Sequence, residues 1–312
     1  AENLLGKKHR TKVLVLTERG GQHGGFTDAG LQWLTDESRK MNFSITEINN
    51  AKPITETYLS QFNLIIQLDY PPYTWPKEAE DAFVKYIEEG KGGWIGFHHA
   101  TLLGEFDGFP LWQWFSDFMG GVRFQNYIAP LADGTVLVED KKHPVMKGVQ
   151  ASFVVPDDEW YTYDKSPRPN VRVLASVDEA TYTPASDIKM GDHPVVWVNE
   201  GKKARNVYFQ IGHSKRLYET EDFTLKAIRG RHFPLLNLGK YGGQPEDYPE
   251  NFGGKEYRHL NFEGTLFSYD FCLTLGKNLR IMLVSGVDEF RNIYKVADEF
   301  KPDLLFRHTA GN

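Results

Sequence analysis

Short apolar runs alternate with amphipathic stretches along the first 120 residues of the chain. The runs are rich in β-branched and aromatic residues and predict buried strands over residues 12–18, 43–48, 63–69 and 92–97. Apolar residues at helical spacing predict helices over residues 27–41, 76–89 and 110–119, with Thr27 as the cap of the first helix. Strands that alternate with helices at these lengths indicate a mostly parallel sheet with helices on both faces.

The pattern changes after residue 122, where short predicted strands are separated by long polar loops. These strands cover residues 135–139, 152–155 and 171–175. A β-hairpin follows, with arms at residues 194–199 and 205–211 joined by the turn Glu200-Gly201-Lys202. The chain to about residue 230 is therefore predicted to form one α/β domain, a mostly parallel sheet that also contains a β-hairpin.

The periodicity weakens after about residue 231. Residues 239–254 are rich in Gly, Pro, Tyr and Asp and predict a loop, whereas residues 278–285 and 303–307 predict strands. Residues 287–300 have the apolar spacing of an amphipathic helix. We therefore divide the chain into a domain over residues 1–230 and an irregular C-terminal extension, residues 231–312, that packs on this domain or completes it.

Composition and charge argue against several classes of protein. The chain has 36 Lys and Arg against 42 Asp and Glu, a net charge of −6, whereas a nucleic-acid binder is expected to carry a basic face. No apolar run approaches the ~20 residues that span a bilayer, so no membrane partner is expected. The one cysteine, Cys272, excludes an intramolecular disulfide, and its apolar neighbours favour a buried structural thiol over a nucleophile.

A glycine-rich loop follows the first predicted strand and contains His23. Its sequence, GGQHGG over Gly20–Gly25, has neither the G-x-G-x-x-G order of a dinucleotide site nor the Gly-Lys-Ser/Thr of a P-loop. We therefore predict no nucleotide cofactor. The glycines still allow a ligand to approach the backbone closely, so His23 is a candidate for substrate binding.

Three further histidines follow predicted strands, and ligands of such sheets bind beyond the carboxyl ends of the strands. His98 and His99 come directly after residues 92–97, and His213 follows the second arm of the hairpin. Because imidazole titrates near neutral pH, these three residues are candidate acid–base catalysts. The alternative is that each is a turn histidine whose ring is satisfied by the backbone.

A dense run of acids and aromatics, Asp157–Asp164, contains Glu159 next to Trp160 and Tyr161. Aromatic rings that cover the apolar face of a sugar, beside a carboxylate that accepts its hydroxyl hydrogen bonds, are common in carbohydrate sites. Glu159 is therefore a candidate catalytic residue, and Trp160 and Tyr161 are candidates for substrate binding. The alternative is a solvated acidic loop with a packed tryptophan.

The same side chains are possible ligands of a metal ion. Neutral imidazoles and a carboxylate suit Zn²⁺ or another divalent ion, and His98, His213 and Glu159 are the candidate ligands. If these side chains converge, metal-assisted chemistry on a carbonyl or hydroxyl becomes the sharper hypothesis. If they do not, acid–base chemistry by the histidines and Glu159 remains.

The order of these motifs along the chain resembles the ThuA-like family, which is named for a trehalose-utilisation protein. The matching segments are Val13–Phe26, Gly92–Ala100, His143–Gly148, Asp158–Tyr161 and Pro194–His213. The resemblance implies a flavodoxin-like three-layer sandwich of the class I glutamine amidotransferase type over residues 1–230. In those amidotransferases a nucleophilic cysteine follows a central strand, but His98 holds that position here, so we do not expect a glutaminase.

The resemblance also implies a carbohydrate-related function. We expect an enzyme that acts on a disaccharide or keto-sugar as a hydrolase, lyase or isomerase. The alternatives are a non-catalytic sugar-binding module and a partner of a sugar oxidoreductase. The resemblance favours a bacterial, periplasmic or secreted setting over a cytoplasmic one. A chain of this family is expected to close with one helix soon after His213, starting here near residues 222–229, so the C-terminal extension departs from the pattern.

Overall fold

A computed structural model of the chain describes residues 11–19, 22–41, 43–146 and 148–219, together with three short strands between residues 271 and 308. These residues belong to two compact units, residues 1–250 and residues 251–312, which we describe separately. Within the described part, the structure contains no helix long and apolar enough to cross a membrane.

The first unit is built on one nine-stranded sheet with the strand order β2-β1-β3-β4-β11-β10-β9-β6-β7. The first five strands in this order run parallel to one another. They are β2 (Phe43–Ile48), β1 (Thr11–Thr17), β3 (Leu64–Leu68), β4 (Gly93–Phe97) and β11 (Asn206–Phe209). All five were predicted as strands; β3, β4 and β11 are fully buried apolar runs, whereas β2, at the edge of the sheet, is only partly buried.

The other half of the sheet is antiparallel. Its strands are β10 (Pro194–Val198), β9 (Arg172–Thr183), β6 (Ala132–Val138) and β7 (Ser152–Asp158). The change of direction falls at the predicted hairpin, since β11 is antiparallel to β10 on one side and parallel to β4 on the other. The predicted α/β class is confirmed, and the sheet combines a flavodoxin-like parallel half with an antiparallel arm.

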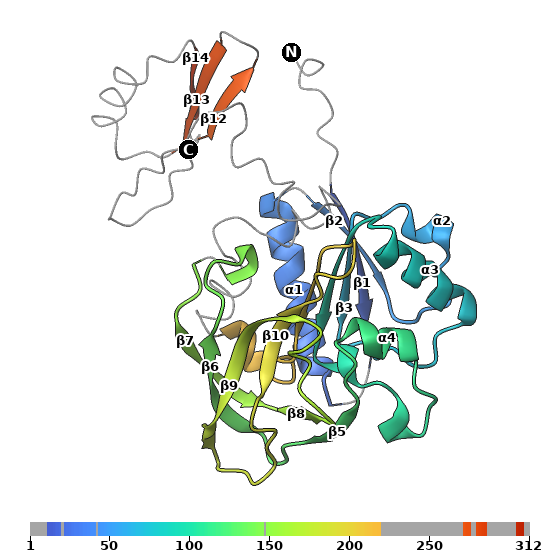
Figure 1. Ribbon diagram of the computed structural model, residues 1–312. Coiled ribbons are helices and arrows are strands. Elements are labelled where there is room, and N and C mark those ends of the chain that lie inside the picture. Colours follow the sequence, from blue (N-terminus) through green and yellow to red (C-terminus); the bar gives the residue numbers. More distant parts are fainter. Residues whose placement is uncertain are drawn as a thin grey trace. The chain divides into compact units, whose positions relative to one another are not determined.

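Helices cover both faces of the parallel half (Figure 1). They are α1 (Gly24–Met41), α2 (Glu56–Leu59), α3 (Lys77–Glu88) and α4 (Gln113–Phe118). Val13 of β1 lies in the same core cluster as Phe26 of α1. The neighbouring Leu14 lies in the other core cluster, with Phe83 of α3. Side chains of β1 therefore alternate between two cores, and the predicted three-layer arrangement follows from this alternation.

Two predicted helix starts are wrong. Helix α1 begins three residues before Thr27, and the carbonyl of His23 accepts a hydrogen bond from the Thr27 amide at 3.1 Å. Thr27 is buried within the helix. The helix starts earlier than predicted because tertiary packing overrides the weak helix propensity of Gly24 and Gly25. Helix α4 begins at Gln113, because the extended backbone of Trp112 (φ −80°, ψ 91°) cannot belong to a helix.

A small antiparallel pair of strands lies beyond the carboxyl ends of the parallel strands (Figure 1). It consists of β5 (Phe124–Tyr127) and β8 (Tyr161–Tyr163), neither of which was predicted as a strand. Four short 3-10 helices, η1 (His98–Thr101), η2 (Glu105–Asp107), η3 (Pro144–Met146) and η4 (Lys215–Glu219), complete the described part of this unit. Turns η1 and η2 and the β5–β8 pair all follow the carboxyl edge of the sheet.

The second unit contains a three-stranded sheet in the order β12-β13-β14. Its strands are β12 (Phe271–Leu275), β13 (Leu279–Ser285) and β14 (Leu304–His308). The two strands predicted over residues 278–285 and 303–307 are confirmed, and Cys272 lies in the third. The helices expected near residues 222–229 and over 287–300 lie outside the described residues. That this region packs on the first domain stays a prediction.

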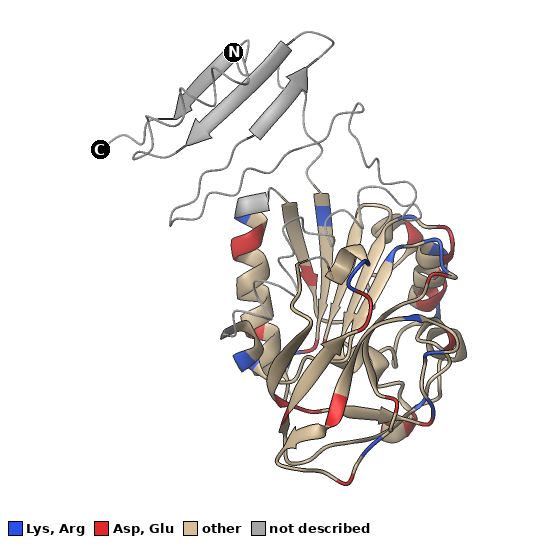
Figure 2. Cartoon of the chain, turned by 60° about the vertical axis from the view of Figure 1, so that its left-hand side comes forward, with Lys and Arg blue, Asp and Glu red and all other residues tan. Residues whose placement is uncertain are grey.

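Figure 2 shows basic and acidic residues interspersed along the loops and helices of the first unit, whereas most of its sheet is neutral. The described residues nevertheless include four buried carboxylates, Glu37, Asp69, Asp158 and Glu159. Three of them, Asp69, Asp158 and Glu159, stand directly after or at the end of strands of the large sheet. Burial of a carboxylate is costly unless it is paired, so this edge of the sheet calls for a chemical explanation.

Candidate functional site

A tight turn connects β4 to η1 and presents His98. The backbone of His98 has φ +36°, a conformation that is strained for any residue except glycine. A side chain at Gly96 would place its Cβ 2.2 Å from the Trp94 ring, and one at Gly212 would place it 2.6 Å from the His98 Cβ. Glycine at both positions therefore permits the close approach that this turn requires.

The imidazole of His98 has one occupied and one available nitrogen. Its Nδ1 lies 2.6 Å from the carbonyl oxygen of Gln210. Because a carbonyl only accepts hydrogen bonds, Nδ1 carries the proton and Nε2 keeps its lone pair. The ring of Tyr161 stacks on this imidazole with 4.0 Å between centroids, which fixes its orientation.

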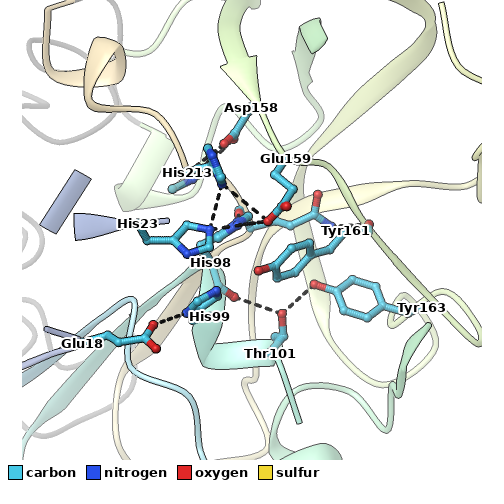
Figure 3. Close-up of polar contacts among 12 residues, drawn as sticks. Glu18, His23, His98, His99, Thr101, Asp158, Glu159, Tyr161, Tyr163 and His213 are labelled. Carbon is cyan, nitrogen blue, oxygen red and sulfur yellow. Dashed lines mark hydrogen bonds and ion pairs between the residues drawn. The ribbon is translucent and has the colours of Figure 1, made fainter. Parts of the chain in front are cut away.

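Four side chains converge on one point, and we call them the four-ligand cluster: His23, His98, Glu159 and His213 (Figure 3). One potential ligand atom from each lies within 4.8 Å of all the others. The Glu159 Oε2 atom lies 3.3 Å from His98 Nε2, 3.4 Å from His23 Nε2 and 3.5 Å from His213 Nδ1. The His23 Nε2 and His213 Nδ1 atoms are 2.8 Å apart.

The cluster is assembled from four separate segments of the chain. His23 lies in the loop after β1, His98 follows β4, and His213 lies beyond β11. Glu159 stands in the short link between β7 and β8, so the antiparallel arm supplies the carboxylate to histidines of the parallel half. The structure thus brings together the three predicted metal ligands, His98, His213 and Glu159, and adds His23, for which the sequence predicts substrate binding.

Burial sets the protonation state of the cluster. It lowers the pKa of His23 to about 4 and that of His98 to about 3, so both rings are neutral at pH 7. Burial raises the pKa of Glu159, but the neighbouring imidazoles of His213, His23 and His98 outweigh this effect and hold that pKa well below its usual range. Neutral imidazoles beside an ionised carboxylate are the protonation states that metal ligands require.

The geometry of the cluster fits one small divalent ion. Ligand atoms at about 2.0–2.2 Å from a tetrahedral ion are roughly 3.3–3.6 Å apart. The three separations from Glu159 Oε2, which are 3.3, 3.4 and 3.5 Å, agree with this value. The 2.8 Å contact between His23 and His213 is a hydrogen bond in the free protein and would widen around an ion. The donor set, three imidazoles and one carboxylate, suits Zn²⁺.

Asp158 holds the backbone of His213 in place by hydrogen bonds. Its carboxylate accepts the backbone N–H of His213 at 2.9 Å and that of Gly212 at 3.3 Å. Asp158 is fully buried, and this burial raises its pKa to about 6. The side chain fixes the chain segment that carries His213, so the adjacent pair Asp158-Glu159 supplies one support and one candidate ligand.

A second carboxylate–histidine pair adjoins the cluster. The Nδ1 of His99 hydrogen-bonds the Glu18 carboxylate, and the His99 ring lies edge-on to His23 with 3.9 Å between centroids (Figure 3). Glu18, His23 and His99 also form a second group of potential metal ligands within 4.8 Å. Sequence reasoning missed Glu18 because this residue was the last of the predicted strand over residues 12–18, whereas β1 ends at Thr17 and Glu18 follows it.

Three buried hydroxyls lie beneath the turn at His98. The Thr101 Oγ1 is 2.7 Å from the Tyr163 hydroxyl and 2.5 Å from the Tyr208 hydroxyl. Tyr208 donates a hydrogen bond to the carbonyl oxygen of His98 at 2.9 Å. These contacts hold the strained residue in place. Sequence reasoning missed Tyr208 because an aromatic residue within an apolar run carries no local sign of a polar role.

Trp160 lies apart from the cluster, contrary to the prediction that it binds substrate. Its indole is buried and donates a hydrogen bond to the Ala132 carbonyl at 2.8 Å, and it packs against Tyr182. Neighbouring residues of an extended segment face opposite ways, so Glu159 and Tyr161 approach His98 while Trp160 enters the core. Tyr161 remains at the site through its stack on His98.

The parallel half of the sheet and the cluster at its carboxyl edge define a flavodoxin-like α/β protein. A family model described as "ThuA: Trehalose utilisation" matches residues 12–233. The chain therefore belongs to the ThuA family, which connects it with carbohydrate use. A search of curated proteins finds no match.

The solved structures similar to this chain include two ThuA-like proteins. A putative ThuA-like protein from Bacteroides uniformis ATCC 8492 is 29% identical, with a TM-score of 0.63, over 75% of this chain and 91% of that chain. A putative ThuA-like protein from Parabacteroides merdae ATCC 43184 is 18% identical, with a TM-score of 0.54, over 78% of this chain and 94% of that chain. The second likeness concerns the fold alone.

Proposed function

We propose that the chain is a metal-dependent enzyme that acts on a saccharide, with Zn²⁺ or a similar ion bound by His23, His98, Glu159 and His213. The observation that carries this proposal is the convergence of four ligand atoms within 4.8 Å from four separate segments. The saccharide is proposed because the family is described by trehalose utilisation. A disaccharide or its keto derivative is the substrate class that we favour.

The charges of the four ligands determine the net charge that a bound ion would keep. Three neutral imidazoles contribute no charge, and Glu159 contributes one negative charge, so a dication bound there keeps a net positive charge. An ion held by these four residues would polarise a carbonyl or hydroxyl oxygen of the substrate by accepting it as a fifth ligand. Asp158 and the Gln210 carbonyl hold His213 and His98 in position through the contacts described above.

We assign the acid–base role to His99. Glu18 accepts a hydrogen bond from its Nδ1, which leaves Nε2 as the proton acceptor. Within the described part of the chain, no hydrogen bond occupies that nitrogen, and the ring lies beside His23 of the cluster. His99 would therefore take a proton from a substrate held at the cluster, and Glu18 would stabilise the resulting imidazolium. His98 and His213 then serve as ligands rather than as acid–base catalysts.

A glutaminase is disfavoured by the chemistry of the turn after β4. A thiol nucleophile would be expected there, and the chain has His98 with a ring nitrogen committed to the Gln210 carbonyl. The single cysteine, Cys272, lies in the second unit of the chain.

Metal analysis of the full chain, purified without a His-tag, tests the proposal. We expect about one zinc ion per chain, and loss of that zinc in His98→Ala and Glu159→Gln. His143→Ala is the matched control, since this half-buried histidine pairs with the Val145 amide outside the cluster. A 3-keto disaccharide should be turned over only by the metal-loaded protein. Substoichiometric metal, together with turnover that survives chelation, would contradict the proposal, and sugar binding without turnover would favour a binding module.

A further inference from the structure

Phe106 is an exposed aromatic side chain close to the candidate site. It is 55% exposed and lies in η2, between the turn at His98 and helix α4. An isolated exposed apolar residue needs no explanation on its own. The exposure of Phe106 requires an explanation because its segment is held by specific contacts and because its ring contacts a series of aromatic rings that reaches the site.

The segment around Phe106 is braced by neighbouring contacts. Tyr73 donates a hydrogen bond to the Asp107 carboxylate at 2.8 Å and stacks on Phe109 with 4.6 Å between centroids. Gly104 (φ +95°) allows the chain to turn closely over Tyr73, where a Cβ would lie 3.0 Å from the Tyr73 Cβ. The exposure of Phe106 is therefore a feature that the surrounding contacts maintain.

A continuous path of aromatic contacts leads from Phe106 to the four-ligand cluster. Phe106 meets Phe124 edge to face with 5.1 Å between ring centroids. Phe124 in turn meets Tyr161 at 4.7 Å, and Tyr161 stacks on His98 at 4.0 Å. The exposed ring is thus three ring contacts from a candidate metal ligand.

Exposed polar side chains occur on the two segments that meet at Phe106 and Phe124. Glu105 precedes Phe106 in η2 and lies 3.8 Å from the Arg123 guanidinium, and both side chains are solvent-exposed. Gln125 and Asn126 of β5 are exposed on the same strand that contributes Phe124. An exposed flat ring, on segments that also expose carboxylate, guanidinium and amide groups, offers what the apolar face and the hydroxyls of a pyranose require. One ring with a charged rim is far smaller than the ~1,200 Å² of a stable protein interface, which argues against a protein partner.

We propose that Phe106 forms the platform of a second sugar subsite, which binds the pyranose unit next to the one held at the four-ligand cluster. This inference rests on the proposed function and sharpens it. A subsite beyond the cluster selects a disaccharide or longer glycoside over a monosaccharide. Glu105 and Arg123 contact the hydroxyls of the second unit, while the Phe106 ring covers its apolar face.

Calorimetric titration of the zinc-loaded full chain with trehalose and with glucose tests the subsite. Phe106→Ala should weaken trehalose binding by roughly five- to tenfold and leave glucose binding unchanged. Phe106→Trp should keep the trehalose affinity, and Phe106→Leu should lose it, because leucine supplies apolar area without a flat face. Val154→Ala is the matched control, since Val154 is 57% exposed on β7 and should have no effect.

The outcomes separate the subsite from the metal proposal. Unchanged trehalose affinity in Phe106→Ala overturns the subsite, whether or not the oligomeric state of the variant changes, and so does a wild-type chain that does not bind trehalose. If the chain does not bind zinc, the proposed metal-dependent function is contradicted. A loss of trehalose affinity in Phe106→Ala would still support the subsite in that case. Zinc bound at full stoichiometry with equal effects on glucose and trehalose also overturns the subsite.

Discussion

The Oε2 atom of Glu159 lies within 3.5 Å of a nitrogen from each of three histidines, and no other side chain of the four-ligand cluster has this position. The three imidazoles follow strands of the parallel half of the sheet, β1, β4 and β11. Their proximity is tolerable because the rings of His23 and His98 are neutral and one anionic oxygen lies between the three imidazoles. Glu159 therefore determines whether the cluster can hold a cation.

Glu159→Gln should keep the shape of the cluster while removing its charge. We expect zinc affinity to fall by roughly 100-fold or more, measured by competition with a chromophoric chelator. Glu179→Gln is the matched control, because this carboxylate also pairs with a buried histidine, His193, at 2.8 Å but lies outside the cluster. Equal loss of zinc in both variants would contradict the assignment.

Position along the chain reveals the histidines of the site but not their distances. His23, His98, His99 and His213 could be selected because ligands of a parallel sheet bind after its strands. The meeting of residues 23, 98, 159 and 213 depends on the pairing of β4 with β11 and on the course of the antiparallel arm, which no local pattern encodes.

The turn from β4 into η1 is the structural element that the site most depends on. His98 adopts φ +36° at a cost of about 1–3 kcal/mol, so surrounding contacts must hold it there. Tyr208 holds its carbonyl, and Gly212 leaves room for its Cβ. Strand β4 and its partner β11 were predictable from their apolar runs, whereas the hydroxyl groups that contact the turn were not.

Tyr208→Phe should loosen this turn. Loss of the hydrogen bond to the His98 carbonyl should lower the free energy of unfolding by about 1–2 kcal/mol and zinc affinity by roughly tenfold. Urea unfolding of the metal-free chain and a zinc titration measure the two effects. Tyr182→Phe removes a buried hydroxyl contact with His193 at 3.2 Å, so it should affect stability and spare zinc. Unchanged zinc affinity in Tyr208→Phe would show that the turn does not need this support.

Gly212→Ala tests the close approach on the other side of the turn. The added Cβ would lie 2.6 Å from the His98 Cβ, so we expect a loss of about 1–3 kcal/mol in the free energy of unfolding. Gly24→Ala is the control, because a Cβ there meets nothing within 4 Å and alanine favours a helix. A Gly212→Ala chain as stable as the wild type would mean that the packing is looser than described.

At the scale of the whole molecule, the first unit joins two kinds of sheet. The parallel half follows from continuous apolar runs, and the hairpin that ends it was also predictable. The β5–β8 pair was missed because β8 lies in a dense run of acids and aromatics that is typical of a loop, and β5 has only four residues. Consequently the fold could be predicted well. The segment that contributes Glu159 and Tyr161 to the site could be predicted only as a cluster of residue types.

Arg168 ties the antiparallel arm together. Its guanidinium bonds Glu139 at 2.7 Å and Asp192 at 2.6 Å, and these hydrogen bonds lower the pKa of both carboxylates. A lowered carboxylate pKa stabilises the fold above the unfolded values of 4.5 and 3.8, and this stabilisation is lost as the pH falls below them. The groups are 35–44% exposed, so the contribution should stay below ~1 kcal/mol.

Arg168→Gln should therefore flatten the acid dependence of stability. Urea unfolding at pH 7 and at about pH 3.5 should show a smaller difference in the variant than in the wild type. Arg39→Gln, at an exposed ion pair within α1, should leave that difference unchanged. An equally steep acid dependence in Arg168→Gln would show that other carboxylates dominate it.

Anomalous diffraction at the zinc edge, from crystals of the tag-free full chain, tests the metal centre most directly. We predict one peak at about 2.0–2.2 Å from His23 Nε2, His98 Nε2, Glu159 Oε2 and His213 Nδ1. A zinc-saturated crystal with no peak at this position, or with zinc bound by Glu18 and His99 instead, would contradict the proposed centre.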